Sequence, residues 1–296
     1  MTKTQNYLSI LICTFIFSCC INKKEDVPIK LSEREQLFIN FFIDNNLDNS
    51  PENLLAIGRK ALYMGYNIKG NIILKYALTK LDSITYEDYH SISVQNTKNG
   101  NYSIAKEMLD SALSLSSEIH GYYGWISLYY HRNYSKALYH LEEYDKLTPN
   151  FSDAPVGEDI HFLKGLCFMQ LSEYGKAVEE FKLNIKEVEK SSGNDWINPY
   201  SYFYLGRCLH KMDKFEKAIG CYNNAIKLYE SSSESYFYKA LSYLELGEKE
   251  KAIINLEVAF ALVSKGLKQS DPYVELFDEV YINQVKEELI KIKSDK

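Results

Sequence analysis

Residues that interrupt helices are scarce in this chain: its 296 residues include six prolines and fourteen glycines. Proline removes a backbone donor and glycine adds backbone freedom, so their scarcity permits long uninterrupted helices. Lysine and arginine form no dense stripe, and the formal net charge is -6. Because phosphate binding requires clustered cations, we expect no nucleic-acid partner.

Motifs of the common catalytic and cofactor sites are also missing. The sequence contains no glycine-rich phosphate loop, no Gly-x-Ser-x-Gly elbow and no His-Glu-x-x-His pair. None of the six histidines lies three or four residues from another, so no helix face offers two histidine ligands to a metal. We therefore expect a protein that is not an enzyme and that binds neither a cofactor nor a metal.

The first twenty residues have the pattern of a secretory signal. Lys3 precedes an apolar or small run, Tyr7–Phe17, that ends at Ser18. A helix needs about 20 apolar residues to cross a bilayer, and this run is too short. Nothing later in the sequence resembles a membrane-spanning helix, so the body is expected to be anchored to a membrane without crossing it.

The segment Ile-Phe-Ser-Cys at residues 16–19 resembles a bacterial lipoprotein processing site. The resemblance implies a signal peptide over residues 1–18, lipidation of Cys19, and an anchor and polar tether over residues 19–30. Phe17 departs from the pattern, because a smaller residue is usual there, and Cys20 is the second candidate for the lipid. The alternative is an ordinary signal peptide that happens to contain cysteines.

Three further cysteines, Cys167, Cys208 and Cys221, lie far apart in the body and form no Cys-x-x-Cys pair. Each falls within a helical apolar pattern, where cysteine behaves as a small hydrophobic residue. We expect them to be buried free thiols.

A pattern of small residues repeats through the body of the chain. Two segments, Tyr200–Glu230 and Glu234–Val263, align at an offset of 34 residues. Three small residues superpose, spaced by twelve and then by seven: Gly206, Ala218 and Ala225 in the first segment, and Ala240, Ala252 and Ala259 in the second. Upstream, Gly165 and Ala177 keep the first two places, whereas Trp125, Ala137 and Tyr144 keep only the middle one.

These units resemble tetratricopeptide repeats (TPRs), whose period and alternation of small and aromatic residues they share. The resemblance covers about Pro51 to Val263 and implies an all-α superhelical array of helix hairpins. It places an N-terminal helix at residues 31–50, about six repeats at 51–266 and C-terminal capping helices at 267–296. Small residues let the paired helices approach closely, and aromatic residues fill the space between units.

In TPR arrays the first helices of successive units line an inner groove. The resemblance implies that this groove is aromatic, with a basic patch around Arg207 and Lys211. Its predicted residues are Tyr122, Tyr129, Tyr130, Phe162, Met169, Phe203, Arg207, His210, Lys211, Phe237 and Leu244. Such a groove either holds an extended peptide or a partner helix, or its side chains pack on one another and close a tight superhelix.

The sequence thus favours a non-enzymatic scaffold that binds a protein or peptide and is held at the bacterial cell envelope by a lipid. An immunity-type lipoprotein that binds a toxin, and a glycan-binding lipoprotein, are the alternatives. Residue 20 is cysteine and not aspartate, so the usual inner-membrane retention signal is absent. The outer membrane is therefore expected over the inner one.

Overall fold

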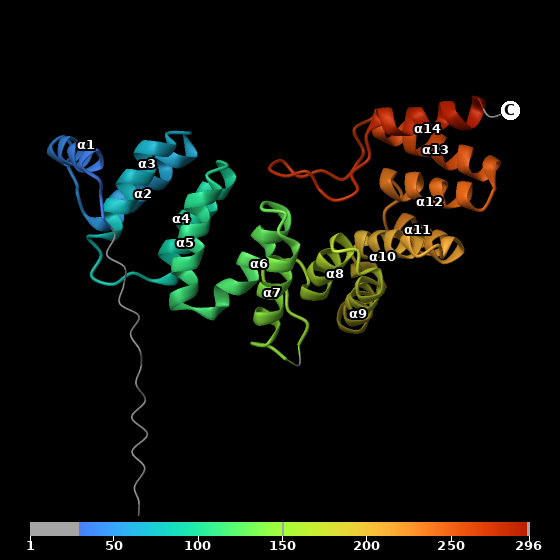
Figure 1. The fold of residues 1–296 in the computed structure, drawn as a ribbon, viewed down its shortest axis with the longest axis horizontal. Helices are drawn as coiled ribbons and strands as arrows, with labels where there is room; N and C mark the ends of the chain where they lie inside the picture. The colour runs from blue at the N-terminus through green and yellow to red at the C-terminus, as the bar shows by residue number, and fades with distance from the viewer. Residues whose placement is uncertain (1–29, 150, 295–296) are drawn as a thin grey trace, which may run out of the picture.

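The computed structural model describes residues 30–149 and 151–294, so the signal segment, Cys19 and Cys20 lie outside the described residues. The described chain is helical throughout, without a strand, and forms an elongated array of helix hairpins (Figure 1). The α-helices are α1 (Glu33–Asp44), α2 (Pro51–Tyr63), α3 (Asn67–Leu78), α4 (Tyr86–Lys98), α5 (Tyr102–Leu115), α6 (His120–Tyr129), α7 (Tyr134–Asp145), α8 (Ile160–Gln170), α9 (Tyr174–Ser192), α10 (Pro199–Lys211), α11 (Phe215–Leu228), α12 (Ser233–Glu245), α13 (Lys249–Ser264) and α14 (Ile282–Ser294).

Six consecutive hairpins, from α2–α3 to α12–α13, form units 1 to 6. Their helices begin at local signals in the sequence. At α4, Thr85 accepts a hydrogen bond from the backbone of Asp88, whose carboxylate accepts one from the backbone of Thr85. Ser32 and Glu35 form the same capping box at α1. Each box satisfies two backbone donors that the helix itself cannot pair.

The turn inside each hairpin contains one residue with left-handed backbone. These residues are Gly65, Gly100, Arg132, Ser172, Asp213 and Gly247, with φ between 50° and 84°. The residue after each one donates its N–H back to a carbonyl in the last turn of the first helix, as Lys214 N does to Leu209 O at 2.9 Å. This bond satisfies a carbonyl that the helix leaves unpaired and reverses the chain direction.

Unit 3 differs from the alignment expected from the sequence. Its turn holds four residues between α6 and α7, whereas the other five turns hold three. The extra residue moves the first small position from Trp125, where the expected spacing put it, to Gly124. A Cβ on Gly124 would lie 2.7 Å from Cγ of Leu141, so Gly124 is the residue at the helix crossing.

Each hairpin is closed by a small residue on its first helix facing a large side chain on its second. A Cβ on Gly206 would lie 2.6 Å from Cε1 of Tyr222, and one on Gly165 would lie 2.8 Å from Cε1 of Phe181. Both aromatic partners are fully buried. Units 2 and 6 have Ser93 and Ala240 in place of glycine, and the residue sixteen positions later is leucine in both. Where the opposing side chain is aromatic, in units 4 and 5, the first position is glycine, whereas opposite leucine it is glycine in units 1 and 3, serine in unit 2 and alanine in unit 6.

The second and third small positions lie between helices. Ala177, Ala218, Ala225, Ala252 and Ala259 are all fully buried. Asn184 takes the third position of unit 4, and there the hydroxyl of Ser201 on the next helix donates to its Oδ1 at 2.5 Å. A buried hydrogen bond at this position replaces the close apolar contact that alanine makes elsewhere.

The hydrophobic core is divided along the array. Unit 1 and α1 share one cluster, α5 and α6 share a second, units 3 to 5 form the largest, and unit 6 forms a fourth with α14. Each unit buries its apolar faces against its neighbours, as in other repeat stacks. Cys167 and Cys208 lie in the largest cluster as fully buried free thiols, and Cys221 is a partly buried free thiol beside it.

The C-terminal region contains one capping helix, and the residues before it, which were also expected to be helical, are not. Only α14 is helical there, and its Val285 and Ile292 are buried in the cluster of unit 6. Residues 267–281, called the strap below, leave α13, extend back toward the middle of the array and return to α14 (Figure 1). The strap starts after Gly266, where φ is 75°, and contains Pro272, which cannot continue a helix.

Unit 3 also contains a buried pair of histidines. Nδ1 of His120 and Nδ1 of His140 are 2.8 Å apart, so one ring donates to the other. The ring of Tyr123 stacks on His140 at 4.1 Å between centroids. Burial, reinforced by the neighbouring His120, lowers the pKa of His140 to about 4. Its Nε2 has no hydrogen-bond partner among the described residues, so the neutral ring is the favoured form.

We expect Gly206→Ala to lower the free energy of unfolding by about 1–3 kcal/mol, because the added methyl group overpacks the fully buried Tyr222. Gly220 on α11 is the matched control, because a Cβ there meets nothing within 4 Å. Gly220→Ala should leave stability unchanged or raise it by up to about 1 kcal/mol, through helix propensity alone. Urea unfolding followed by circular dichroism measures both, and equal effects of the two substitutions would contradict the crossing argument.

We expect the protein to lose stability between about pH 7 and pH 5 through His140. The folded-state pKa of about 4 lies below the ordinary value of 6.5. The unfolded chain therefore takes up a proton first as the pH falls, and the stabilisation present above pH 6.5 is lost toward pH 4. One unit of pKa difference corresponds to about 1.4 kcal/mol, so the loss should reach about 1–2 kcal/mol by pH 5. The measurement is urea unfolding at both pH values for wild type and His140→Gln, and an equal pH slope in the two proteins would refute it.

Candidate binding surfaces

The eleven residues predicted to line an open groove are mostly covered. Six are buried: Tyr129, Phe162, Met169, Phe203, Arg207 and Phe237. Four are partly buried, namely Tyr122, Tyr130, His210 and Leu244, and Lys211 alone is exposed. Some of them pack on neighbouring aromatic residues, as when Phe162 meets Tyr204 with ring centroids 5.9 Å apart. The strap contacts two of the eleven, Tyr129 and Arg207.

Phe277 is the aromatic anchor of the strap. Its ring is 6% exposed and stacks on Tyr129 at 5.6 Å between centroids. The edge of Tyr134 meets it at 6.0 Å, and the guanidinium of Arg132 lies 4.4 Å from its centroid. Two aromatic rings and a cation therefore enclose this side chain, an arrangement that favours an aromatic residue over an aliphatic one.

Asp278 is the acidic anchor, and it lies next to the aromatic one. Nε and Nη2 of Arg207 donate to its two carboxylate oxygens at 2.9 and 3.0 Å. The guanidinium also stacks on the ring of Tyr238 at 3.6 Å. Burial disfavours the charge of Arg207, but the hydrogen bonds and charge of Asp278 outweigh burial and raise its pKa above the ordinary value. This paired geometry is specific for a carboxylate.

Further contacts hold the main chain and the ends of the strap. The hydroxyl of Tyr204 donates to the carbonyl of Phe277 at 2.9 Å. Gln269 N donates to a carboxylate oxygen of Glu234 at 2.8 Å, and Lys268 pairs with Glu279 across the two arms of the strap. Near the tip, the ammonium of Lys98 lies 5.1 Å from the ring centroid of Tyr273. The strap therefore contacts the first helices of units 2, 3, 5 and 6.

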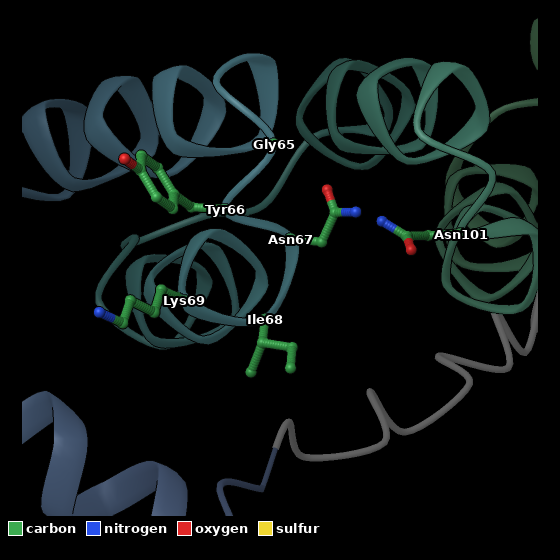
Figure 2. Close-up of a pocket in the computed structure, with 6 residues that line it drawn as sticks. All are labelled: Gly65, Tyr66, Asn67, Ile68, Lys69 and Asn101. Atoms are coloured by element: carbon green, nitrogen blue, oxygen red, sulfur yellow. The ribbon is translucent and has the colours of Figure 1, made fainter.

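A different surface is open at the other end of the array, on the turn between α2 and α3. Its side chains Tyr63, Met64, Tyr66 and Ile68 are 81%, 58%, 57% and 79% exposed, and they are called the unit-1 turn surface below. A shallow pocket lies beside them, lined by Gly65, Tyr66, Asn67, Ile68, Lys69 and Asn101. In Figure 2 the side chains of Asn67 and Asn101 point toward one another, and those of Tyr66, Ile68 and Lys69 point away from them.

The other repeats show that this apolar turn is a property of unit 1 and not of the fold. The residues that correspond to Tyr63 in units 2, 4, 5 and 6 are Lys98, Gln170, Lys211 and Glu245. Those that correspond to Ile68 in units 2 to 6 are Ser103, Ser135, Gly175, Glu216 and Glu250. Unit 3 alone has an aromatic residue at the first place, Tyr129, and the strap covers it.

Charge also distinguishes unit 1. Residues 51–80 contain five basic side chains and one acidic side chain, a net charge of +4, whereas the whole chain carries -6. Lys60 and Lys69 flank the unit-1 turn surface and are exposed. An acidic surface would therefore be attracted to this end of the molecule.

Trp196 is an exposed aromatic side chain in the connection between units 4 and 5. It lies in the short 3-10 turn Asn194–Trp196 between α9 and α10 and is 76% exposed. The described residues contain no group of three or more histidine, cysteine, aspartate or glutamate side chains placed to hold a metal ion. None of the helices described has the length and apolar character needed to cross a bilayer.

The comparisons with known proteins concern the fold. Residues 193–259, which hold most of units 5 and 6, match the family described as "Anaphase-promoting complex, cyclosome, subunit 3". No curated protein matches the chain. The C-terminal part of a TPR repeat-containing protein from Cytophaga hutchinsonii is similar, with a TM-score of 0.56 and 18% identity over 78% of this chain and 89% of that one.

Two other solved structures are similar over most of this chain. The pilF protein of Pseudomonas aeruginosa has a TM-score of 0.53 and 15% identity, over 83% of this chain and 97% of that one. A chain of the APC/C hetero-tetramer Cut9–Hcn1 has a TM-score of 0.54 and 16% identity over 88% of this chain. The match covers 46% of the length of that other chain. These likenesses establish the predicted all-α, TPR-like superhelical fold.

Proposed function

We propose that this protein is a non-enzymatic scaffold, held at the bacterial cell envelope by a lipid on Cys19, that docks a protein partner on the unit-1 turn surface. The observation that carries the proposal is the exposure of Tyr63, Tyr66 and Ile68 at positions where most other units have polar or charged residues, with the exposed Met64 between them. Solvent-exposed clusters of large apolar side chains mark interaction sites in soluble domains.

The composition of the surface fits a protein partner. Tyrosine and methionine are enriched in protein interfaces, and tyrosine often contributes a large share of the binding energy. Lys60 and Lys69 beside the surface add positive charge. The partner that fits is therefore a protein surface with apolar side chains bordered by aspartate and glutamate, whose charge would also speed association.

The position of this surface in the chain supports the envelope part of the proposal. Unit 1 and α1 follow directly after the tether predicted from the sequence. The eleven residue steps from Cys19 to Lys30 span at most roughly 40 Å when fully extended. A lipid at Cys19 would thus keep unit 1 close to the membrane. The membrane proposed is the outer one.

We expect Tyr63→Ser combined with Ile68→Ser to abolish partner capture without changing stability, because both side chains are exposed. The measurement is affinity purification of the tagged, lipidated protein from its own envelope fraction, with co-purifying proteins identified by mass spectrometry. Ile254→Ser is the matched control, since Ile254 in unit 6 is a comparably exposed isoleucine, at 61%, remote from unit 1. It should retain every partner.

The identity and number of captured proteins decide between related functions. Several envelope proteins would support an adaptor, and one tightly bound secreted toxin would support an immunity protein. Capture that is equal in the wild type and the unit-1 variant would refute docking at this surface. If no protein is enriched at all, the scaffold proposal fails and glycan binding becomes the reading to test.

We expect Cys19→Ala to move the protein from the membrane fraction to the soluble fraction and to abolish incorporation of a labelled fatty acid. Cys20→Ala is the matched control and should keep both properties, because it leaves the proposed lipid attachment site intact. If Cys20→Ala alone loses the fatty-acid label, Cys20 is the modified residue. Membrane retention of an unlabelled double variant would exclude a lipid anchor.

A further inference from the structure

We infer that the inner groove of units 3 to 6 is a two-point binding site for an extended peptide carrying an aromatic residue followed directly by an acidic one, and that the strap is its occupant in cis. This goes beyond docking on unit 1, because it concerns a separate surface at the other end of the array. It rests on the contacts that Phe277 and Asp278, two neighbouring residues of the strap, make with the repeats.

The aromatic point is built by residues that do not belong to the strap. Tyr129 on α6, Tyr134 on α7 and Arg132 in the turn between them surround the ring of Phe277, at 5.6, 6.0 and 4.4 Å between centres. Arg132 lies in the turn of unit 3, which has an additional residue, and the two tyrosines border that turn. The insertion that sets unit 3 apart therefore lies at the cage around Phe277.

The acidic point requires an occupant. Arg207 is 7% exposed, and among the described residues its one carboxylate partner is Asp278 of the strap. A buried guanidinium without an anion is strongly unfavourable, so an empty groove would favour any ligand that supplies a carboxylate in the right place. The guanidinium of Arg207 stacks on the ring of Tyr238, 3.6 Å from the ring centroid. This stacking holds the guanidinium so that its paired N–H donors face the groove.

The groove also binds a peptide backbone group. The hydroxyl of Tyr204, whose ring is 1% exposed, donates to the carbonyl of Phe277. This contact depends on main chain alone and would be available to any peptide in the same register. Aromatic ring, carbonyl and carboxylate thus form three successive contacts along two residues, as expected for recognition of an extended segment.

The strap has features of an exchangeable occupant. Residues Ser270 to Tyr273 are exposed at its tip, and the whole segment lacks regular secondary structure. Asp278 binds with φ at 57°, a left-handed conformation that residues other than glycine adopt rarely. A peptide that is not tied to α13 and α14 can present the same two side chains without that constraint.

The test measures binding of a fluorescein-labelled peptide with the strap sequence, residues 267–281, to the full-length protein in detergent. In wild type the strap occupies the groove and binding should be weak. Phe277→Ala combined with Asp278→Ala should release the strap and tighten binding by at least about tenfold. A peptide carrying the same two alanines should fail to bind the opened protein.

Two further variants assign the binding to the groove. Adding Arg207→Ala to the opened protein should remove the gain, whereas adding Lys211→Ala should not, because Lys211 is exposed and pairs with nothing in the strap. Circular dichroism and thermal unfolding establish that each variant is folded. If the double alanine variant does not fold, Asp278→Asn alone serves as the milder opening.

A folded, opened protein that binds the strap peptide no better than a scrambled peptide would overturn the inference and leave the strap as a structural closure only. Binding that persists after Arg207→Ala would overturn the two-point site. The unit-1 turn surface is intact in all these variants, so partner capture there is scored separately and its failure has a different cause.

Discussion

The closest contact in each hairpin, between a small residue of the first helix and a large side chain of the second, is the constraint on which the array depends. At Gly206 and Tyr222, a single added carbon would approach an aromatic atom to 2.6 Å. This contact sets how near the two helices lie, and their separation fixes which faces remain for the neighbouring units. Because no unit can bury its apolar faces alone, an error at one crossing would propagate into two interfaces.

Local periodicity was sufficient to predict this part of the structure. Small residues spaced by twelve and seven report helix packing within and between adjacent hairpins, and these contacts are short in sequence. Unit 3 escaped the pattern because one extra residue in its turn moves Gly124 out of register with Ala137. The left-handed residue of that turn is Arg132 and not glycine, so the usual turn signal was missing as well.

The strap could not be predicted in the same way. Asp278 and Arg207 are 71 positions apart, and no repeat relates them. An apolar and acidic segment after a repeat array looks like a capping helix when only its composition is considered. Asp271-Pro272 was the one local signal against a helix, since proline restrains the residue before it and removes a helical donor. Which segment fills a groove depends on tertiary contacts, and here that segment belongs to the same chain.

Two tyrosines at the same repeat position show how the two ends of the molecule differ. Tyr129, at the end of α6, is 6% exposed because Phe277 lies on it, whereas Tyr63, at the end of α2, is 81% exposed. The strap covers Tyr129, and within the described part of the chain its contacts reach toward the N-terminus as far as Lys98 in unit 2. An aromatic surface gains free energy when water leaves it, whether the cover comes from the same chain or from another. Unit 3 receives its cover in cis, whereas the corresponding surface of unit 1 is exposed.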